Sequence, residues 1–161
     1  MSPEEFNRTF RSNLQQINAY FARRVPASEI EELASQLFEI AWTKRAQIPE
    51  GLELPWLYKS ARYLVANFHR KEQGRSRILA TFREPAAAPS AESIALADIG
   101  LSNAFAGLST LEREVISLWA LEGLNPEELG LALEVSENAA SIRLSRAKSK
   151  LKELLRAESF E

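Results

Sequence analysis

The stretch NPEELGLALEVS, residues 125–136, decides the fold of the last part of the chain. Asn125 can cap the start of a helix, and Pro126 suits the first helical turn, where its missing N–H is not needed. Leu129, Leu133 and Val135 are expected to pack inward. Ser136 can cap another helix directly afterwards. The stretch therefore predicts a short helix, a tight turn and a second helix, which is the arrangement of a helix-turn-helix.

Two residues of this stretch bear on how tightly the chain can turn. Gly130 is small, as a close crossing of two helices requires. Glu134 occupies the turn position where this motif usually has glycine, because the residue there adopts a left-handed backbone conformation. A glutamate in that conformation costs about 1 kcal/mol of backbone strain.

The expected second helix, residues 137–156, has an apolar face and a basic face when its residues are placed about 100° apart. The apolar face comprises Ala140, Leu144, Ala147, Leu151, Leu154 and Leu155. The opposite side carries Arg143, Arg146 and Lys150, together with Ala139 and Ile142. Arginine can bind guanine through two hydrogen bonds or hold a phosphate, and an apolar side chain can contact a thymine methyl. The pattern favours DNA binding over the alternative, an amphipathic helix of a bundle whose outer face only meets water.

Helical periodicity runs through most of the remaining sequence, and strand signals are nearly absent. Earlier helices are expected over residues 4–24, 28–42, 56–73, 104–106 and 111–122. The stretch PAAAPSA, residues 85–91, has the composition of a linker. We therefore predict an all-α protein with two small helical domains, over residues 1–74 and 104–161, joined by a flexible linker over residues 75–103.

The composition argues against several classes of function. The chain has 161 residues, no cysteine and one histidine, so neither a disulfide nor a thiolate or multi-histidine metal site is expected. No nucleophile–histidine pair, phosphate-binding glycine loop or metal cluster is visible, so we expect neither an enzyme nor a cofactor. No apolar run is long enough to span a membrane and no signal peptide is recognisable, so we expect a cytoplasmic protein without membrane insertion of its own.

Positive charge is gathered in two stripes, although the formal net charge is -2. Residues 59–77 and residues 136–156 each contain six Lys or Arg, against one acid in the first stripe and two in the second. Residues 112–134 contain six acids and one Arg. The stripes could face a polyanion such as DNA. For a single stripe, a solvated helix face is the simpler interpretation.

Several stretches resemble the sigma-70 family of RNA polymerase sigma factors. LEREVISL at 111–118, LEGL at 121–124, the helix-turn-helix and RLSRAK at 143–148 resemble region 4 of that family. EELASQLFEIAW at 31–42 resembles region 2.2, and PWLYKSARYLVAN at 55–67 resembles regions 2.3 and 2.4. Two such domains joined by a linker are the layout of the extracytoplasmic-function, or group IV, subfamily.

The resemblance implies promoter recognition and transcription initiation, in a stress or envelope regulon under the control of an anti-sigma factor. Region 2 would bind RNA polymerase core enzyme and capture the minus-ten element of promoter DNA as it melts. Region 4 would bind the duplex minus-thirty-five element. The polymerase contact would be the polar outer face of the 28–42 helix, made by Glu32, Ser35, Gln36 and Glu39.

The resemblance also implies DNA contacts in the first domain. Single-strand capture needs cations for phosphates and a ring for stacking, which the outer face of the 56–73 helix offers with Lys59, Arg62, Tyr63, Asn67, Arg70 and Lys71. A half-buried position of Tyr63 against a neighbouring helix is an equal alternative. The opposite face is expected to point inward, with Leu57, Ala61, Leu64, Val65 and Phe68.

Two further groups of DNA contacts follow from the same resemblance. The loop over residues 43–55 is where the family holds a flipped promoter base, and its candidates are Lys44, Arg45 and Gln47. In the second domain, the DNA contacts are expected at Arg113, Asn138, Ser141, Ile142, Arg143, Arg146 and Lys150.

The chain departs from the family pattern at several of these positions. Ser35 and Gln36 replace a Gln-Glu or Gln-Asp pair, Asn67 replaces an Asp, and Ser141 replaces a common Lys. These changes imply weaker or altered contacts. Two alternatives therefore stay open, namely a helix-turn-helix regulator that is not a sigma factor, and a helical protein-interaction module that has lost promoter use.

Overall fold

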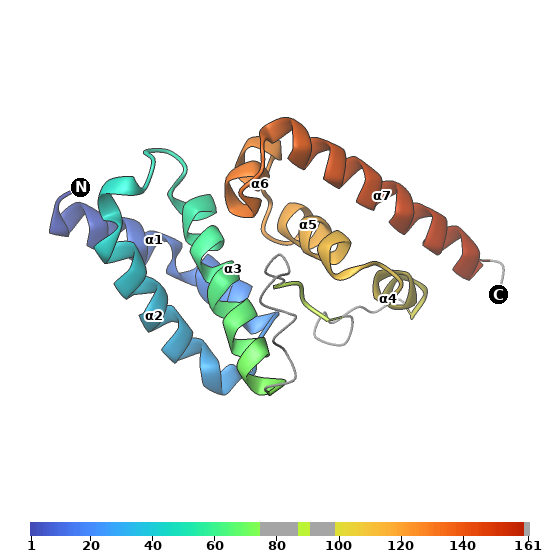
Figure 1. Cartoon of the computed structure of the whole chain (residues 1–161), viewed down its shortest axis with the longest axis horizontal. Coiled ribbons are helices and arrows are strands. Elements are labelled where there is room, and N and C mark those ends of the chain that lie inside the picture. Colours follow the sequence, from blue (N-terminus) through green and yellow to red (C-terminus); the bar gives the residue numbers. More distant parts are fainter. Residues whose placement is uncertain (75–86, 91–98, 160–161) are drawn as a thin grey trace. The chain divides into compact units, whose positions relative to one another are not determined.

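The computed structural model describes residues 1–74, 87–90 and 99–159, and it shows helices, turns and coil without a strand among these residues (Figure 1). The chain divides into two compact units, Met1–Ala87 and Ala88–Glu161. The prediction of an all-α protein with two helical units is confirmed. Most of the predicted linker, at residues 75–86 and 91–98, lies outside the described residues.

The first unit is built from α1 (Pro3–Ala22), α2 (Ile30–Thr43) and α3 (Glu53–Glu72), and each of these helices contacts the other two. Short 3-10 turns at Ala27–Glu29 and Arg45–Gln47 flank α2. The core consists of side chains from all three helices, among them Phe6, Ile17, Phe21, Leu33, Leu37, Ala41, Leu57, Ala61 and Val65.

The start of α1 is fixed by a reciprocal pair of hydrogen bonds. The Glu5 backbone N–H donates to the Ser2 hydroxyl at 3.2 Å, and the Ser2 backbone N–H donates to the Glu5 carboxylate at 2.8 Å. These bonds satisfy two donors that an uncapped helix would leave open. The Ser2 backbone N–H also holds the pKa of the Glu5 carboxyl below its usual value, because it stabilises the ionised form.

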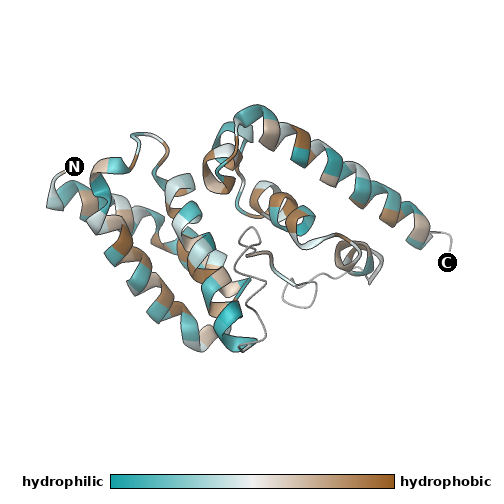
Figure 2. Cartoon of the chain, viewed as in Figure 1, coloured by the Kyte–Doolittle hydropathy of each residue, from teal (hydrophilic) through white to brown (hydrophobic). Residues whose placement is uncertain are grey.

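The second unit is built from α4 (Ile99–Ala106), α5 (Thr110–Ala120), α6 (Pro126–Leu133) and α7 (Glu137–Ser159). Helix α7 contacts each of the other three. Apolar and polar residues alternate around the helices of both units, as expected for helices that bury one face (Figure 2). Leu118, Leu129, Ala132, Ala140 and Ala147 are among the most deeply buried residues of this unit.

Some helix boundaries differ from those expected. Helix α2 begins at Ile30 after a 3-10 turn, so Ser28 does not cap it. Helix α3 begins at Glu53 and includes Pro55, which is tolerated because first-turn N–H groups have no partner within the helix. Helix α4 begins at Ile99, inside the segment expected to be linker.

The predicted helix-turn-helix is present as α6, a turn and α7. The Asn125 side chain accepts a hydrogen bond from the Glu128 N–H at 2.9 Å, and the Glu128 carboxylate accepts one from the Asn125 N–H at 3.0 Å. The Ser136 hydroxyl accepts one from the Ala139 N–H at 3.0 Å and so caps α7. Glu134 has φ 59 and ψ 42, the left-handed conformation expected of it.

Gly130 sets how closely the turn approaches α6. A Cβ atom at this position would lie 2.8 Å from the carbonyl oxygen of Val135 and 3.2 Å from the backbone nitrogen of Glu137. Both contacts are with backbone, which cannot rotate away as a side chain can. Any residue other than glycine would therefore push α6 and the start of α7 apart.

We expect Gly130→Ala to lower the free energy of unfolding by about 1–3 kcal/mol, the usual cost of forcing an extra methyl group into a closely packed site. Gly107→Ala is the matched control, because the nearest atom to its new Cβ would be Leu154 Cδ1 at 3.1 Å, the end of a flexible side chain. Urea denaturation followed by circular dichroism measures both. Equal stability of the two variants would contradict the assigned role of Gly130.

Candidate nucleic-acid interface

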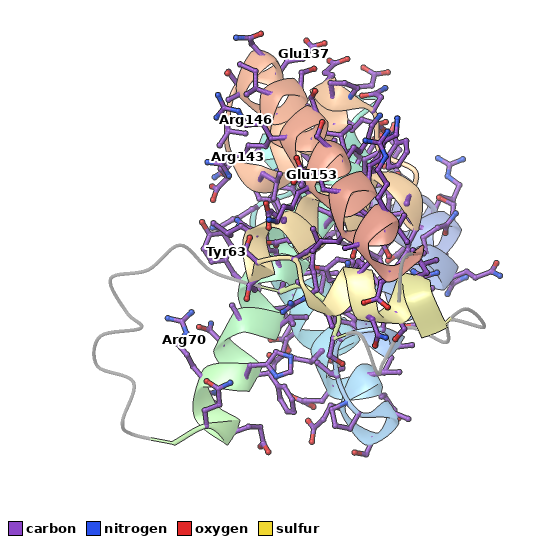
Figure 3. The ribbon with its side chains drawn as sticks, turned by 90° about the vertical axis from the view of Figure 1, so that its right-hand side faces the viewer. Tyr63, Arg70, Glu137, Arg143, Arg146 and Glu153 are labelled. Atoms are coloured by element: carbon purple, nitrogen blue, oxygen red, sulfur yellow. The ribbon has the colours of Figure 1, made fainter. Side chains whose placement is uncertain are left out.

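Helix α7 presents its basic residues to solvent. It packs inward through Ala140, Leu144 and Ala147, which are buried as predicted. Arg143 and Arg146 project from one side of the helix (Figure 3). The predicted contact residues of α7 differ in exposure. Asn138, Ile142, Arg146 and Lys150 are exposed, whereas Ser141 and Arg143 are half-buried.

A shallow hollow lies between α5 and α7 beside these arginines. It has a volume of about 300 Å³ and is lined by Leu111, Glu112, Val115, Arg143, Arg146 and Ala147. Leu111 is 42% exposed, so the hollow opens on an apolar surface. The result is a pair of guanidinium groups beside an apolar patch, a combination that suits the phosphates and the methyl or sugar groups of a nucleic acid.

Arg113 is half-buried and contacts the connection between α4 and α5. Its Nη1 donates to the Leu108 carbonyl oxygen at 2.8 Å. Its Nε is buried without a hydrogen-bond partner among the described residues. These contacts favour a structural role for Arg113, which the family resemblance had assigned to DNA.

Helix α3 carries a second polar surface. Tyr63 is 38% exposed, and Tyr63 and Arg70 project from the same side of the helix (Figure 3). Arg70 donates through Nη2 to the side-chain oxygen of Asn67 at 2.7 Å. Lys71 is exposed, and Lys59 is half-buried with its ammonium 5.2 Å from the centre of the Trp56 ring. A partly exposed ring beside cations is compatible with base stacking.

The placement of Arg62 on this outer surface is wrong. Its side chain is only 2% exposed and makes interactions within the protein. Helix α3 packs against both α1 and α2, and its buried residues include Tyr58, Arg62 and Ala66 beside the expected apolar ones. Leu57, Ala61 and Val65 are buried as expected, whereas Leu64 and Phe68 are only half-buried. The prediction assumed that α3 buries one apolar face. A helix with two neighbouring helices can bury a wider part of its surface than that.

The loop between α2 and α3 contains three residues that were predicted to contact DNA, and they differ in exposure and in their contacts within the protein. Lys44 and Gln47 are exposed. The Arg45 guanidinium lies 3.9 Å from the centre of the Trp42 ring, and its Nη1 donates to the Trp42 carbonyl oxygen at 2.7 Å. A neighbouring hollow of about 400 Å³ is lined by Met1, Glu5, Thr9, Arg45, Ala46, Ile48, Glu50 and Glu53. Its three carboxylates favour an uncharged group over a phosphate.

The outer face of α2 is polar, as predicted. Glu32, Ser35 and Glu39 are exposed, while Gln36 is half-buried and donates to the Glu32 carboxylate at 3.0 Å. Phe38 lies on the same helix and is 38% exposed. Its ring contacts the rings of Phe6 and Phe10 at centroid distances of 5.2 and 5.1 Å. The spacing of apolar residues within α2 did not predict an exposed ring at Phe38, because its partners Phe6 and Phe10 belong to α1.

Two further features, one in each unit, were not predicted from the sequence. Trp119 is 40% exposed, and the Lys148 ammonium lies 4.4 Å from the centre of its ring. Arg24 is buried in the first unit although it follows the last turn of α1. Its guanidinium lies 3.8 Å from the centre of the Tyr20 ring, and its Nε donates to the Ala87 carbonyl oxygen at 2.6 Å. An arginine close to a helix end that is rich in aromatic residues could have signalled such a stacked position.

Two absences hold for the described part of the chain. Residues 1–74, 87–90 and 99–159 contain no group of three or more His, Cys, Asp or Glu placed to hold a metal ion. None of the helices that the structure describes has the length and apolar character needed to cross a membrane.

We expect Arg62→Ala to lower the free energy of unfolding by about 3 kcal/mol, because it leaves the partners of a buried charge unpaired and creates a cavity. Tyr63→Ala is the matched control at the adjacent position, and its partly exposed ring should cost less than about 1 kcal/mol. Thermal unfolding of both variants distinguishes the buried from the exposed side of α3. A larger loss for Tyr63→Ala would contradict the burial of Arg62.

Comparisons with known proteins agree with this arrangement. Residues 100–151 match the family model for sigma-70, region 4. The fold is similar to that of the sigma factor RpoE from Bartonella quintana, solved in complex with the anti-sigma factor NepR, with 23% identity, a TM-score of 0.63 and coverage of 95% of this chain and 98% of that chain. It is also similar to CnrH, solved in complex with the cytosolic domain of CnrY, with 20% identity, a TM-score of 0.63 and coverage of 97% and 90%. No curated protein matches the sequence.

The match covers nearly all of α4, then α5, α6, the turn and most of α7, so it includes the capped helix-turn-helix with Arg143 and Arg146. The predicted resemblance to sigma-70 region 4 is confirmed. Residues 100–151 match the model of sigma-70 region 4, and the fold of the whole chain is similar to those of the sigma factor RpoE and of CnrH.

Proposed function

We propose that this protein is an RNA polymerase sigma factor that recognises promoters and starts transcription. The observation that carries the proposal is the region 4 match over residues 100–151, which coincides with a capped helix-turn-helix whose second helix carries the half-buried Arg143 and the exposed Arg146 on one side. The similarity in fold to the sigma factor RpoE and to CnrH extends over nearly the whole chain and supports the same proposal. Neither promoter binding nor polymerase binding requires catalysis by the protein itself.

In the second unit, α7 would lie in the major groove of the minus-thirty-five element. Arg143 and Arg146 can bind guanine edges or phosphates, and exposed Ile142 can contact a thymine methyl. Lys150 lies farther along the helix, where it would neutralise a phosphate. Helix α6 and the tight turn at Gly130 hold α7 at a fixed angle, so these side chains reach the groove as one group.

In the first unit, the exposed side of α3 would hold the melted minus-ten strand. Tyr63 offers a ring for base stacking, and Lys59, Arg70 and Lys71 offer charge for the backbone. The hydrogen bond between Arg70 and Asn67 orients the guanidinium before DNA arrives. Arg62 has no part in this contact, since it is buried.

Three partners follow from this function: RNA polymerase core enzyme, promoter DNA and an anti-sigma factor. The polar face of α2, with Glu32, Ser35, Gln36 and Glu39, is the proposed polymerase contact. The anti-sigma partner is proposed because both related structures contain a partner chain, called an anti-sigma factor in the RpoE complex. A sigma factor works where the polymerase is, so we place its action in the cytoplasm, in control of a stress or envelope regulon.

Run-off transcription tests the proposal directly. Purified core polymerase is mixed with the protein and a pool of genomic promoter fragments, and the transcripts are sequenced. We expect new transcripts with a shared upstream motif that core enzyme alone does not produce. Binding to duplex DNA without transcripts from any promoter would instead support a helix-turn-helix regulator that is not a sigma factor.

We expect Arg146→Ala to weaken binding to the upstream promoter element by about 1–3 kcal/mol if Arg146 binds a base, and by less if it touches only phosphate. Lys152→Ala is the matched control, because Lys152 is an exposed cation of α7 that points away from Arg146. Fluorescence anisotropy with the selected promoter duplex and a scrambled duplex measures the difference. Equal losses for the two variants would show that α7 binds DNA through charge alone.

A further inference from the structure

Phe38 is an aromatic ring on the surface of α2, outside the core of the first unit. The core-facing side of this helix is already filled by Leu33, Leu37 and Ala41, none of which is more than 5% exposed. Phe38 is 38% exposed. A single exposed apolar side chain is ordinary in itself. What distinguishes Phe38 is how firmly the ring is held and what surrounds it.

The ring of Phe38 is held in place by two rings of α1. Its centroid lies 5.2 Å from that of Phe6 and 5.1 Å from that of Phe10, with interplanar angles of 70° and 85°. These are edge-to-face arrangements, a geometry that aromatic pairs prefer. Phe6 and Phe10 are only 2% and 7% exposed, so the core fixes both supporting rings. A partner that covers Phe38 therefore meets a ring with little conformational entropy left to lose.

Phe38 also belongs to a stripe of accessible residues along α2. Residues at spacings of four, three and four lie along one side of a helix, as do Glu31, Ser35, Phe38 and Trp42. Glu31 and Ser35 are exposed, and Trp42 is half-buried. The Trp42 ring contacts Phe6 at a centroid distance of 5.3 Å. Phe38 and Trp42 thus rest on the same buried ring and form one apolar patch.

The charges around this patch all have the same sign. Helix α2 contains three glutamates, Glu31, Glu32 and Glu39, and neither lysine nor arginine. All three are exposed. An acidic surface repels a nucleic acid and favours a partner of the opposite charge. The surface of α2 therefore fits a protein that offers an apolar pocket edged by lysine or arginine.

We infer that Phe38 anchors the contact between the first unit and RNA polymerase core enzyme, with the carboxylates of α2 as the rim of that contact. The inference rests on the proposed function and names the residue that supplies most of its polymerase affinity. Aromatic anchors dominate the binding energy of protein interfaces, whereas rim residues mainly exclude water. The polar neighbours suit a rim, since Gln36 already donates to Glu32 within α2 and Ser35 carries no charge.

Binding of the full chain to purified core enzyme tests the anchor. We expect Phe38→Ala to weaken the complex by about 30-fold, the loss typical of the strongest interface residues. Ser35→Ala and Glu39→Gln should each weaken it by less than about fivefold, as exposed polar positions do. Biolayer interferometry with immobilised core enzyme gives the Kd of each variant.

Phe68→Ala is the matched control, because Phe68 is a half-buried aromatic residue of the same unit that lies on α3. It should leave the affinity for core enzyme nearly unchanged. Circular dichroism compares the helical content and the thermal unfolding of both alanine variants. Phe38→Leu, which keeps an apolar side chain on the rings of α1, should recover much of the lost affinity.

Salt separates the anchor from its rim. The loss of affinity in Phe38→Ala should be the same at about 0.1 M and about 0.5 M salt, because ions do not screen the burial of an apolar ring. The loss in Glu39→Gln should shrink at the higher concentration, because exposed charges are screened. A loss for Phe38→Ala that disappears in high salt would contradict an apolar anchor.

The outcomes also distinguish this inference from the proposed function. If the unsubstituted protein binds core enzyme and Phe38→Ala or Phe68→Ala weakens it equally, the anchor is wrong and the proposed function stands. Unchanged polymerase binding by Phe38→Ala, with loss of the complex with an anti-sigma partner, would assign the ring to that partner and overturn the anchor. If the unsubstituted protein does not bind core enzyme, the proposed function is wrong and the inference falls with it.

Discussion

The backbone contact at Gly130 is the constraint on which the second unit depends. A space too small for a single methyl group separates α6 from the Val135 carbonyl oxygen. Because the turn is drawn so close, the chain must reverse within a few residues, and Glu134 has to adopt a left-handed conformation to do so. The reversal in turn determines the direction in which α7 leaves the turn. The side on which Arg143 and Arg146 emerge is thus set by a glycine that touches neither of them.

The first unit obeys a different constraint, the enclosure of α3 by two neighbouring helices. Helix α3 contacts both α1 and α2, and its buried residues include Arg62 as well as the expected apolar ones. What remains outside is narrow, with Tyr63, Asn67 and Arg70 along it. The aromatic residue and its cationic neighbours are therefore presented as a strip, and a strip suits a single strand better than a duplex.

The sequence allowed the helical class, the capped turn and the exposed face of α7 to be predicted, because each depends on residues close together in the chain. Asn125, Gly130, Glu134 and Ser136 act through neighbours only a few positions away. The burial of Arg62 and the contacts of Arg113 could not be predicted in this way. The burial of Arg62 depends on packing between different helices, and the contact of Arg113 depends on the path of the chain just before α5; the periodicity within one helix contains information on neither.

The contact between Arg24 and Ala87 has a consequence for the order in which the protein is made. Ala87 follows α3, so all three helices of the first unit have left the ribosome before their last partner emerges. Contacts between residues far apart in sequence carry a larger entropic cost of loop closure than local ones. Until Ala87 has been synthesised, the Arg24 Nε therefore lacks the acceptor that it has in the folded protein, whereas its contacts with Tyr20 can already form.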